Sequence, residues 1–433
     1  MARVIYSLLV LLALPIASLV VMWRALGDRE YARGWRERFG LGAPLAGAER
    51  GVWLHAVSVG EVQAASSLAA ALRREWPSLP LAVTSATPAG RARARAAFAP
   101  GIEARYAPYD LPWCVRAALR RLRPTVLVVM ETELWPNLLN ECMRGRVPVL
   151  IVSARLSARS EARWSRFRSL LQPALGANVT VAAQSAQDAA RFVSLGVPAA
   201  RVHVCGNIKF DRVPADAVRA AGLGLRERYA AARPMWVAGS THAGEEQAAL
   251  DAHVRVRALQ PGALLVLAPR HRPRFDEVAR LLDDAQVRWL RHSEVAANPA
   301  ALGADAARVE VLLLDTIGEL ENFYAAADLA FVGGSLAPIG GHNLLEPAAL
   351  GVPTIAGESQ GNAPDVARRL IENAALRLVH DADSLSAAVV ELLGDAAARK
   401  RMAHAAQATL EANRGALDAA LAMIRACLAG RAE

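Results

Sequence analysis

From residue 51 onward, short apolar runs alternate with stretches of helical periodicity, which is typical of α/β folds with parallel strands. The first series predicts strands at 52–57, 81–84, 125–130, 147–152, 179–183 and 202–205. Helices are expected between them, for example over 61–75, 134–143 and 185–194. A polar helix at 217–231 precedes a second series of strands at 235–240, 264–269, 309–315, 329–334, 353–357 and 375–380. The pattern therefore predicts two doubly wound domains in succession.

The N-terminal pattern is different, because Val4 to Trp23 is a run of 20 residues without a charge, about the length that crosses a bilayer. Arg3 precedes the run, whereas five arginines follow it, at positions 24, 29, 33, 36 and 38. The positive-inside rule then places the rest of the chain in the cytoplasm. Pro15 and the marginal length leave open a helix that lies in the membrane interface. A signal peptide is disfavoured, since no small-x-small cleavage site follows.

Composition narrows the choice of partners. The 433 residues, 54% of them hydrophobic, are enough for two or more packed domains. Four cysteines lie far apart with no CxxC pair, which argues against a disulfide framework or a zinc site and favours a reducing compartment. Residues 1–215 hold 28 Lys and Arg against 14 Asp and Glu, and the remaining residues hold 22 against 27. The first half should therefore face an anionic partner, and nucleic acid is disfavoured because interleaved aromatics and a known binding module are missing.

Charged side chains follow three of the expected strands in the first half. Glu61 comes soon after the apolar run 52–57, where a helix N-terminus favours negative charge and the side chain need only be a cap. Glu131 and Glu133 directly follow strand 125–130 and suit proton handling or cation stabilisation, unless they are an N-cap cluster for helix 134–143. Lys209, one of only two lysines, follows strand 202–205.

The second half carries features suited to phosphate and ribose. Strand 264–269 ends at Pro269 and is followed by a basic segment of Arg270, His271, Arg272 and Arg274. This segment is either a phosphate-binding site or a solvated cluster of arginines. The segment 239–246 (GSTHAGEE) opens a helix whose free N–H groups can hold a phosphate. In 331–353, two glycine pairs precede Asn343 and Glu346, a carboxylate able to accept hydrogen bonds from ribose hydroxyls. Neither GxxxxGK[ST] nor GxGxxG occurs here, so neither a P-loop nor a dinucleotide site is indicated.

Eight segments in one order resemble the 3-deoxy-D-manno-octulosonic acid (Kdo) transferases of lipopolysaccharide synthesis, glycosyltransferase family 30. They are SVGE (58–61), METELWPN (130–137), SARLSARS (153–160), KFD (209–211), STHAGEE (240–246), PRHRPRF (269–275), DTIGEL (315–320) and FVGGS with GGHNLLE (331–346). The resemblance covers essentially the whole chain and implies an α/β GT-B fold, with two Rossmann-like domains facing a central cleft. It implies an anchor over 1–24, an acceptor domain for lipid A precursor over 25–212, and a CMP-Kdo-binding domain over 213–433.

The resemblance also implies residue roles. Glu61 would be the general base, ionised by the helix N-terminus, with Glu131 and Lys209 stabilising the transition state of an inverting transfer from CMP-Kdo to lipid A precursor (lipid IVA). Contacts to CMP would fall on Pro269, Arg270, Ile317, Gly318, Glu319, Asn343, Leu344, Leu345 and Glu346. No metal is implied, and no obligate protein partner is evident. The loop 357–365 departs from the family pattern and keeps only Asn362.

Other expectations complete this interpretation. A basic surface for lipid phosphates would come in aggregate from Arg91, Arg93, Arg95, Arg116, Arg120, Arg121, Arg123 and the arginines from 155 to 168. The protein would act at the cytoplasmic face of the inner membrane. The alternatives are another GT-B lipid glycosyltransferase that uses a UDP-sugar, and a membrane-tethered nucleotide-binding scaffold without catalysis.

Overall fold

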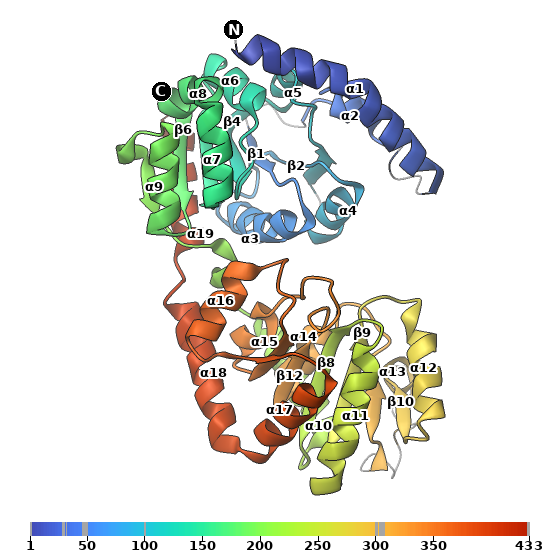
Figure 1. Ribbon diagram of the computed structural model, residues 1–433. Helices are drawn as coiled ribbons and strands as arrows, with labels where there is room; N and C mark the ends of the chain where they lie inside the picture. The colour runs from blue at the N-terminus through green and yellow to red at the C-terminus, as the bar shows by residue number, and fades with distance from the viewer. Residues whose placement is uncertain are drawn as a thin grey trace. The chain divides into compact units, whose positions relative to one another are not determined.

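The computed structural model describes residues 2–27, 31, 33–45, 51–98, 101–298, 302 and 308–430 (Figure 1). The chain forms two compact units, of which the first comprises Met1–Asp211 and Asn413–Glu433 and the second Arg212–Ala412. Each unit contains one seven-stranded sheet whose neighbouring strands are all parallel, flanked by helices. The two predicted doubly wound domains are therefore present.

The first sheet has the strand order β3-β2-β1-β4-β5-β6-β7. Its strands are β1 (Gly51–His55), β2 (Leu81–Ser85), β3 (Ile102–Tyr106), β4 (Pro124–Met130), β5 (Val149–Ala154), β6 (Val179–Ala183) and β7 (Val202–Val204). The order of the strands reverses between β1 and β4, and ligands of such sheets bind outside the carboxyl ends of the strands at this point. The segments that carry Glu61 and Glu131 begin at these two ends.

Helices precede, connect and follow these strands in the first unit. They are α1 (Ala2–Gly27), α2 (Trp35–Arg38), α3 (Val59–Glu75), α4 (Pro88–Ala97), α5 (Pro112–Leu122), α6 (Pro136–Arg144), α7 (Ala158–Arg166), α8 (Arg168–Asn178), α9 (Ala186–Leu195) and α19 (Ala416–Ala429), with 3-10 turns η2 (Ala199–Arg201) and η3 (Ile208–Asp211). Within the described residues, α1 is the one helix long and apolar enough to cross a membrane, judged by length and composition alone.

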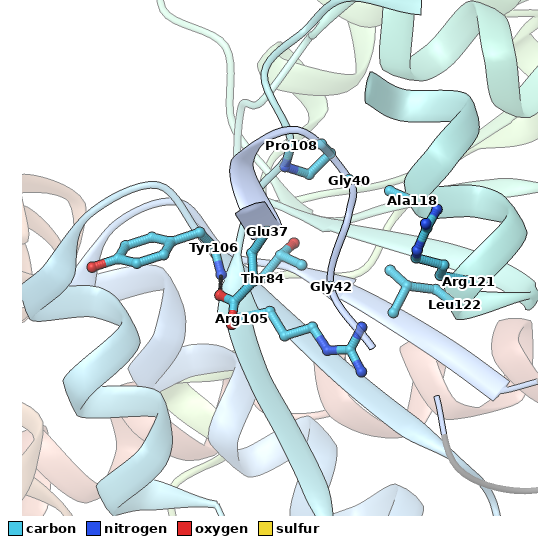
Figure 2. A pocket seen from close by; sticks show the side chains of 10 residues that line it. All are labelled: Glu37, Gly40, Gly42, Thr84, Arg105, Tyr106, Pro108, Ala118, Arg121 and Leu122. Atoms are coloured by element: carbon cyan, nitrogen blue, oxygen red, sulfur yellow. Dashed lines mark hydrogen bonds between the residues drawn. The ribbon is translucent and has the colours of Figure 1, made fainter. Parts of the chain in front are cut away.

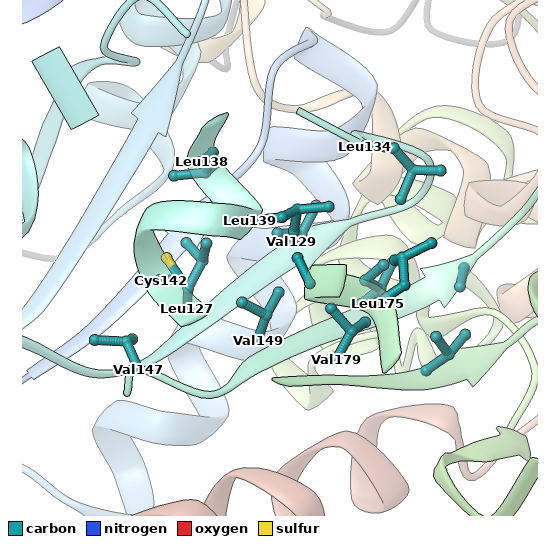
Figure 3. Packing of buried hydrophobic residues seen from close by; sticks show 14 of the residues in the cluster. Leu127, Val129, Leu134, Leu138, Leu139, Cys142, Val147, Val149, Leu175 and Val179 are labelled. Carbon is teal, nitrogen blue, oxygen red and sulfur yellow. The ribbon is translucent and has the colours of Figure 1, made fainter. Parts of the chain in front are cut away.

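Both faces of the first sheet are buried, which explains the unbroken apolar runs of its central strands. Along β4, Leu127 and Val129 pack under α5, α6, α8 and α9, as the cluster in Figure 3 shows in part. The alternate residues Val126, Val128 and Met130 pack under α3, α4 and α19. Successive side chains of a strand point to opposite faces, so this one heptapeptide supplies both halves of the core.

The second sheet has the order β10-β11-β9-β8-β12-β13-β14 and reverses between β8 and β12. Its strands are β8 (Met235–Thr241), β9 (Leu264–Pro269), β10 (Trp289–Arg291), β11 (Val311–Leu313), β12 (Leu329–Val332), β13 (Thr354–Gly357) and β14 (Leu376–Val379). The segments 239–246 and 331–346 follow the two strands at this reversal. They therefore occupy the expected ligand position of the second unit.

The helices of the second unit are α10 (Asp216–Ala230), α11 (Glu245–Leu259), α12 (Arg274–Asp284), α13 (His292–Ala297), α14 (Leu320–Ala326), α15 (Leu345–Leu350), α16 (Pro364–Glu372), α17 (Ala382–Gly394) and α18 (Ala396–Glu411). Apolar residues of α11, α12 and α17 pack on one face of the sheet. Helices α10 and α14 pack against each other, and α14 contacts β8.

The end of the chain differs from the expected 213–433 domain, because residues 413–433 belong to the first unit. Helix α19 lies against α3, β4 and β5 and buries Ala416, Ala420 and Ile424 in the core beneath them. The carboxylate of Asp211 accepts backbone hydrogen bonds from Gly415 (2.6 Å) and Leu417 (2.8 Å) at the start of this helix. The apolar stripe of α19 thus completes a face that the first 211 residues leave uncovered.

Two strands were not predicted, and both lie at the edges of their sheets. β3 has the sequence IEARY and β10 the sequence WLR, each with charged residues and only partial burial. An edge strand borders solvent on one side, so it lacks the continuous apolar run by which the central strands are recognised.

Candidate active site

The carboxylate of Glu61 is held in place at the start of α3. Ser58 is the N-cap residue, so Glu61 lies in the third helical position instead of the first. The Glu61 N–H donates to the Ser58 hydroxyl, which in turn donates to Glu61 Oε1 at 2.9 Å. The backbone N–H of Val57 donates to Glu61 Oε2 at 2.8 Å. This arrangement resembles a capping box, so the capping interpretation is correct as far as it goes.

Glu61 is nonetheless not a simple ionised cap. Only 8% of the residue is exposed, and burial raises the pKa of its carboxyl to about 7, helped by the negative charges of Glu133 and Glu131 and opposed by the hydrogen bonds from Val57 and Ser58. The expectation that the helix N-terminus alone keeps Glu61 ionised at neutral pH is therefore too simple. A pKa close to the working pH is what an efficient general base requires.

Glu131 and Lys209 are brought together from positions 78 residues apart. The Nζ of Lys209 donates to Glu131 Oε1 at 2.6 Å, and both side chains are mostly buried. Turn η3 positions Lys209, because the side chain of Asn207 accepts a hydrogen bond from its backbone N–H and Ile208 is anchored through its N–H to the hydroxyl of Ser153. An ion pair thus lies beyond the carboxyl ends of the strands.

The backbone at this edge of the sheet adopts conformations that non-glycine residues rarely use. Glu131 has φ +56° and Ser153 has φ +51°, both in the left-handed region. Each such residue costs on the order of 1 kcal/mol or more, and such strain gathers at functional sites. A register shift in β5 between Ile151 and Ala154 accompanies the strain at Ser153.

Glu133 and its neighbours form a separate cluster. The indole N–H of Trp135 donates to Glu133 Oε2 at 2.6 Å, and burial raises the pKa of Glu133. The edge of Trp135 packs against His55, whose ring is 4.6 Å away between centroids. His55 is fully buried, its Nδ1 lies 2.9 Å from the hydroxyl of Thr84, and burial lowers its pKa to about 3. A neutral histidine therefore supports the loop that carries both carboxylates.

The alternative that Glu131 and Glu133 cap α6 is wrong, because another residue does so. Asp110 accepts hydrogen bonds from the backbone N–H groups of Asn137 (3.1 Å) and Leu138 (2.8 Å) at the start of α6. Burial raises the pKa of Asp110 to about 6 despite these donors. No local pattern indicates this role, since Asp110 is 27 residues away from Asn137 in the first turn of the helix.

One of the arginines expected to face lipid phosphates, Arg91, has a structural role instead. Arg91 is buried, pairs with Glu37 at 2.8 Å and lies over the ring of Tyr106. Arg105, which was not part of the predicted basic surface, is also buried and, with Glu37 and Tyr106, lines a small hollow of about 20 Å³ (Figure 2). Most of the predicted basic side chains are exposed, namely those of the arginines at 93, 95, 116, 120, 123, 159, 163, 166 and 168. Arg121 and Arg155 are half-buried, so Arg91 is the one member of the predicted set that is fully withdrawn from the surface.

In the second unit, Glu245 organises the loop after β12. This buried carboxylate accepts hydrogen bonds from the backbone N–H of His242 and from four successive N–H groups, those of Gly334, Ser335, Leu336 and Ala337, at 2.7 to 3.2 Å. Those N–H groups are therefore satisfied by the protein. Sequence reasoning treated 239–246 only as a helix opening and missed this role of Glu245, although an acidic residue in the first helical turn was visible.

Three histidines gather beside Arg270, beyond β8, β9 and β12. The Nε2 atoms of His242 and His342 are 2.8 Å apart, and His271 stands edge-on to His242. Burial and then the positive charge of Arg270 lower the pKa of His342 to about 4, and burial also lowers the pKa values of His242 and His271. Neutral imidazoles beside an exposed guanidinium offer hydrogen bonds and positive charge to an anion.

The remaining residues expected to bind nucleotide lie in two short loops. Asn343 donates to Glu346 Oε1 at 3.0 Å and accepts from the N–H of Leu345, so these residues form one turn. The side chains of Leu344 and Leu345 are buried, which leaves their backbone for any ligand contact. After β11, Ile317 is 55% exposed and Gly318 has φ +96°. An exposed isoleucine beside a glycine is a suitable face for a flat base.

The divergent loop 357–365 supports the second glycine pair. The side-chain amide of Asn362 donates to the carbonyls of Ile339 and Gly341, while the hydroxyl of Ser359 accepts from Gly340. Gly340 has φ +100°, and a Cβ there would meet the Asn362 amide at 3.0 Å. Asn362, the one residue of this loop that keeps the family pattern, therefore holds the backbone of the second glycine pair in place. Ser359 contributes to the same support.

No group of three or more His, Cys, Asp or Glu side chains within the described part of the chain is arranged to hold a metal ion. Lys209 pairs with Glu131 in the first unit, and the positive charge of Arg270 acts on His342 in the second. Charge neutralisation by the chain's own side chains is therefore available in each unit.

Comparisons with known proteins agree with this architecture. Residues 33–212 match the family described as 3-deoxy-D-manno-octulosonic-acid transferase (kdotransferase), and residues 305–409 match glycosyl transferases group 1. The 3-deoxy-D-manno-octulosonic acid transferases of Haemophilus influenzae and Bordetella pertussis are 35% and 37% identical, covering 98% and 93% of this chain and 98% and 94% of their own. A solved S. aureus MnaA–UDP structure has a TM-score of 0.53 at 15% identity, covering 89% of this chain and 98% of its own.

The two parallel sheets, the glycosyltransferase match and the likeness of fold define a glycosyltransferase of the GT-B class. Similarity over almost the full length then sets the family. The chain belongs to the Kdo transferases of lipopolysaccharide biosynthesis. The expected family, fold class and enzymatic character are thereby confirmed.

Proposed function

We propose that this Kdo transferase moves Kdo from CMP-Kdo to lipid A precursor (lipid IVA) with inversion, without a metal, and at the cytoplasmic face of the inner membrane. The observation that carries the proposal is Glu61, whose two carboxylate oxygens are fixed by Ser58 and Val57 and whose pKa is raised by burial to about 7. A positioned base that is partly ionised at neutral pH suits a reaction in which a hydroxyl must lose its proton.

In the proposed reaction, the acceptor hydroxyl oxygen attacks the anomeric carbon of Kdo while its proton passes to Glu61. The bond between that carbon and the phosphate oxygen breaks, and CMP leaves with the electron pair. The transition state resembles an oxocarbenium ion. The negative charge of Glu131 offsets the developing positive charge, and Lys209 holds Glu131 in place and neutralises the carboxylate or phosphate of the donor.

The second unit would hold the CMP portion of the donor. Arg270 and the three histidines beside it suit the phosphate, and the turn formed by Asn343 and Glu346 suits the ribose hydroxyls. The exposed Ile317 would pack against the base. These contacts require no metal because Arg270 supplies positive charge directly.

The test is incubation of the purified protein with CMP-Kdo and tetraacylated lipid A precursor. CMP release and a Kdo-sized increase in the mass of the lipid are the expected results. Binding of CMP without a change in the lipid would favour the scaffold, whereas turnover of a UDP-sugar in place of CMP-Kdo would favour the other glycosyltransferase. A control with Glu277→Gln, on the exposed surface of α12, should behave as wild type.

A further inference from the structure

Helix α1 has one half-buried and one exposed face. The half-buried residues recur every three or four positions, at Arg3, Tyr6, Ser7, Val10, Leu14, Ser18, Val21 and Ala25. Such spacing marks one face of an α-helix. The polar side chains between Val4 and Trp23 whose burial is described, namely Tyr6, Ser7 and Ser18, all lie on this half-buried face. The helix therefore rests against the first unit (Figure 1). Its polar side chains lie on the side that faces this unit.

Hydrogen bonds fix the N-terminal part of α1 to the folded unit. The Tyr6 hydroxyl donates to Asp110 Oδ2 at 2.9 Å. The Ser7 hydroxyl lies 3.1 Å from the side-chain nitrogen of Asn137, which is fully buried. Asp110 and Asn137 are the residues that shape the start of α6, so α1 is bonded to the element that follows the loop of Glu131 and Glu133. Contacts of α1 with α6 and α8 accompany these bonds.

These contacts are incompatible with a helix that crosses the bilayer. At 1.5 Å per residue, Tyr6 and Trp23 are about 26 Å apart along the axis, close to the thickness of the hydrocarbon core of about 30 Å. A spanning helix with Trp23 next to the folded unit would put Tyr6 at the opposite surface. Asp110 and Asn137 belong to the folded unit and cannot follow it there. Tyr6 can therefore bond to Asp110 only if the helix stays on the side of the unit.

The outer face of α1 consists of large apolar residues, namely Val4, Ile5, Leu8, Leu9, Leu11, Leu12, Ile16, Leu19, Val20, Met22 and Trp23, each at least 40% exposed. An apolar surface of this extent requires a partner. Because it is continuous and uncharged from Val4 to Trp23, acyl chains of a single leaflet fit it without leaving any polar group unpaired.

We propose that α1 lies in the plane of the membrane, its outer face in the acyl chains of one leaflet and its inner face docked on the first unit through Tyr6–Asp110 and Ser7–Asn137. The inference rests on the proposed function, which supplies the membrane-bound acceptor, and adds how the protein meets that acceptor. A lipid in the same leaflet reaches the protein beside α6, next to the loop that carries Glu131 and Glu133. The helix is then part of the acceptor-side surface instead of a tether.

Labelling from one side of the membrane at a time distinguishes a helix α1 that lies in the plane of the membrane from one that crosses the bilayer. In the full chain with the half-exposed Cys205 and Cys427 replaced by serine, Ala2→Cys reports the start of α1 and Arg401→Cys, on the exposed surface of α18, reports the body. A membrane-impermeant maleimide should label both positions in inside-out vesicles and neither in intact spheroplasts. Labelling of Ala2→Cys from outside and of Arg401→Cys from inside would overturn the proposal.

Docking is tested by crosslinking in the same membranes. Ser7→Cys combined with Asn137→Cys should form a disulfide on mild oxidation, joining the two fragments after proteolysis between them, whereas Leu8→Cys with Asn137→Cys should not, because Leu8 faces outward. Absence of the first disulfide in a variant that still releases CMP would overturn the proposal. A protein that is soluble without membranes or detergent, as a dimer in which a second copy covers the outer face of α1, would also overturn the proposal. CMP release measured in detergent tests the proposed reaction separately from either result.

Discussion

At Glu61, two opposing influences meet on one carboxyl group. Burial favours the protonated form, while the hydrogen bonds from Val57 and Ser58 favour the carboxylate. Because the balance sets the pKa at about 7, the base should be only partly ionised at neutral pH. The proposed base therefore acts over a pH range in which small changes alter its charge.

The rate of Kdo transfer should rise with pH through a single ionisation near pH 7. Only the carboxylate form of Glu61 can accept the proton, so activity is lost as the pH falls below the pKa of about 7. The measurement is CMP release at saturating CMP-Kdo between pH 5 and 9. A profile that is flat down to pH 5 would contradict the assignment of Glu61 as the base.

Replacing Glu61 by Gln should lower kcat on the order of 10²- to 10⁴-fold while CMP affinity stays unchanged. The same variant tests how the ionisation of Glu61 affects stability. The pKa of the carboxyl is about 7 in the folded protein and about 4.5 in the unfolded chain, so its contribution to stability is fully present below pH 4.5 and is lost as the pH rises through 7. The difference in Tm between wild type and variant should therefore shift in favour of the variant from pH 5 to pH 8. Undiminished turnover in a folded variant would refute the mechanism.

The Glu131–Lys209 pair should behave as a unit. Glu131→Gln and Lys209→Met should each lower kcat on the order of 10²-fold, since each removes charge from the site where charge develops. The double variant should lose little more than the worse single one, because residues that act together are not additive. Kinetics of the four proteins give the coupling, and strictly multiplicative losses would show that the two act independently.

Among the loops, the one after β12 depends on a single side chain. Glu245→Gln replaces an oxygen that accepts backbone hydrogen bonds by an NH₂ group that cannot, leaving buried N–H groups unpaired. We expect a loss of about 3 kcal/mol in the free energy of unfolding and about tenfold weaker CMP binding. Thermal unfolding and calorimetric titration measure the two effects. Glu277→Gln, one helix further on and exposed, should change stability by less than about 0.5 kcal/mol.

Central and edge elements differ in how far the sequence predicts them. β4 reads as a buried strand from PTVLVVM alone, because both its faces pack against helices. β3 and β10 border solvent and contain charged residues, so they pair only because a neighbouring strand offers free backbone groups. A run of apolar residues identifies a strand that is buried on both faces. It does not identify a strand at the edge of a sheet, whose residues are more polar.

The same limit applies to the candidate site. Glu61, Glu131 and Lys209 were found because each follows a recognisable strand, and their motifs resemble those of a known family. The Lys209–Glu131 contact, the cap on α6 by Asp110 and the loop held by Glu245 join residues 27 to 92 positions apart. The hydrophobic pattern of the sequence carries no information on such distant partners, so these contacts become visible only in the folded structure.

At the scale of the whole molecule, the first unit depends on the end of the chain. Ile424→Ala should lower the free energy of unfolding by about 2–5 kcal/mol, since a fully buried side chain leaves a cavity between α19 and the sheet. The neighbouring Arg425→Ala, which removes a largely exposed pair with Glu75 and a contact with the ring of Trp76, should cost less than about 1 kcal/mol. Denaturant titration of both variants makes the comparison, and equal losses would contradict the packing of α19.

A chain that stops at residue 412 should fail to form a stable first unit. It lacks α19, so Val62, Leu68 and the other apolar residues of that face would meet water. We expect it to aggregate. A single chain in which residues 1–211 are joined to residues 413–433 by a flexible linker should form a soluble first unit. Soluble, protease-resistant protein from residues 1–211 alone would show that α19 is dispensable.

Helix α19 also reverses the usual order of events during synthesis. Domains generally mature in the order in which they leave the ribosome, the N-terminal one first. Here the apolar α1 emerges first, yet the unit to which it belongs waits for the last helix of the chain, after the whole second unit has been made. A polypeptide terminated before α19 should therefore display an unfinished hydrophobic surface, the kind of surface by which chaperones and proteases select their targets.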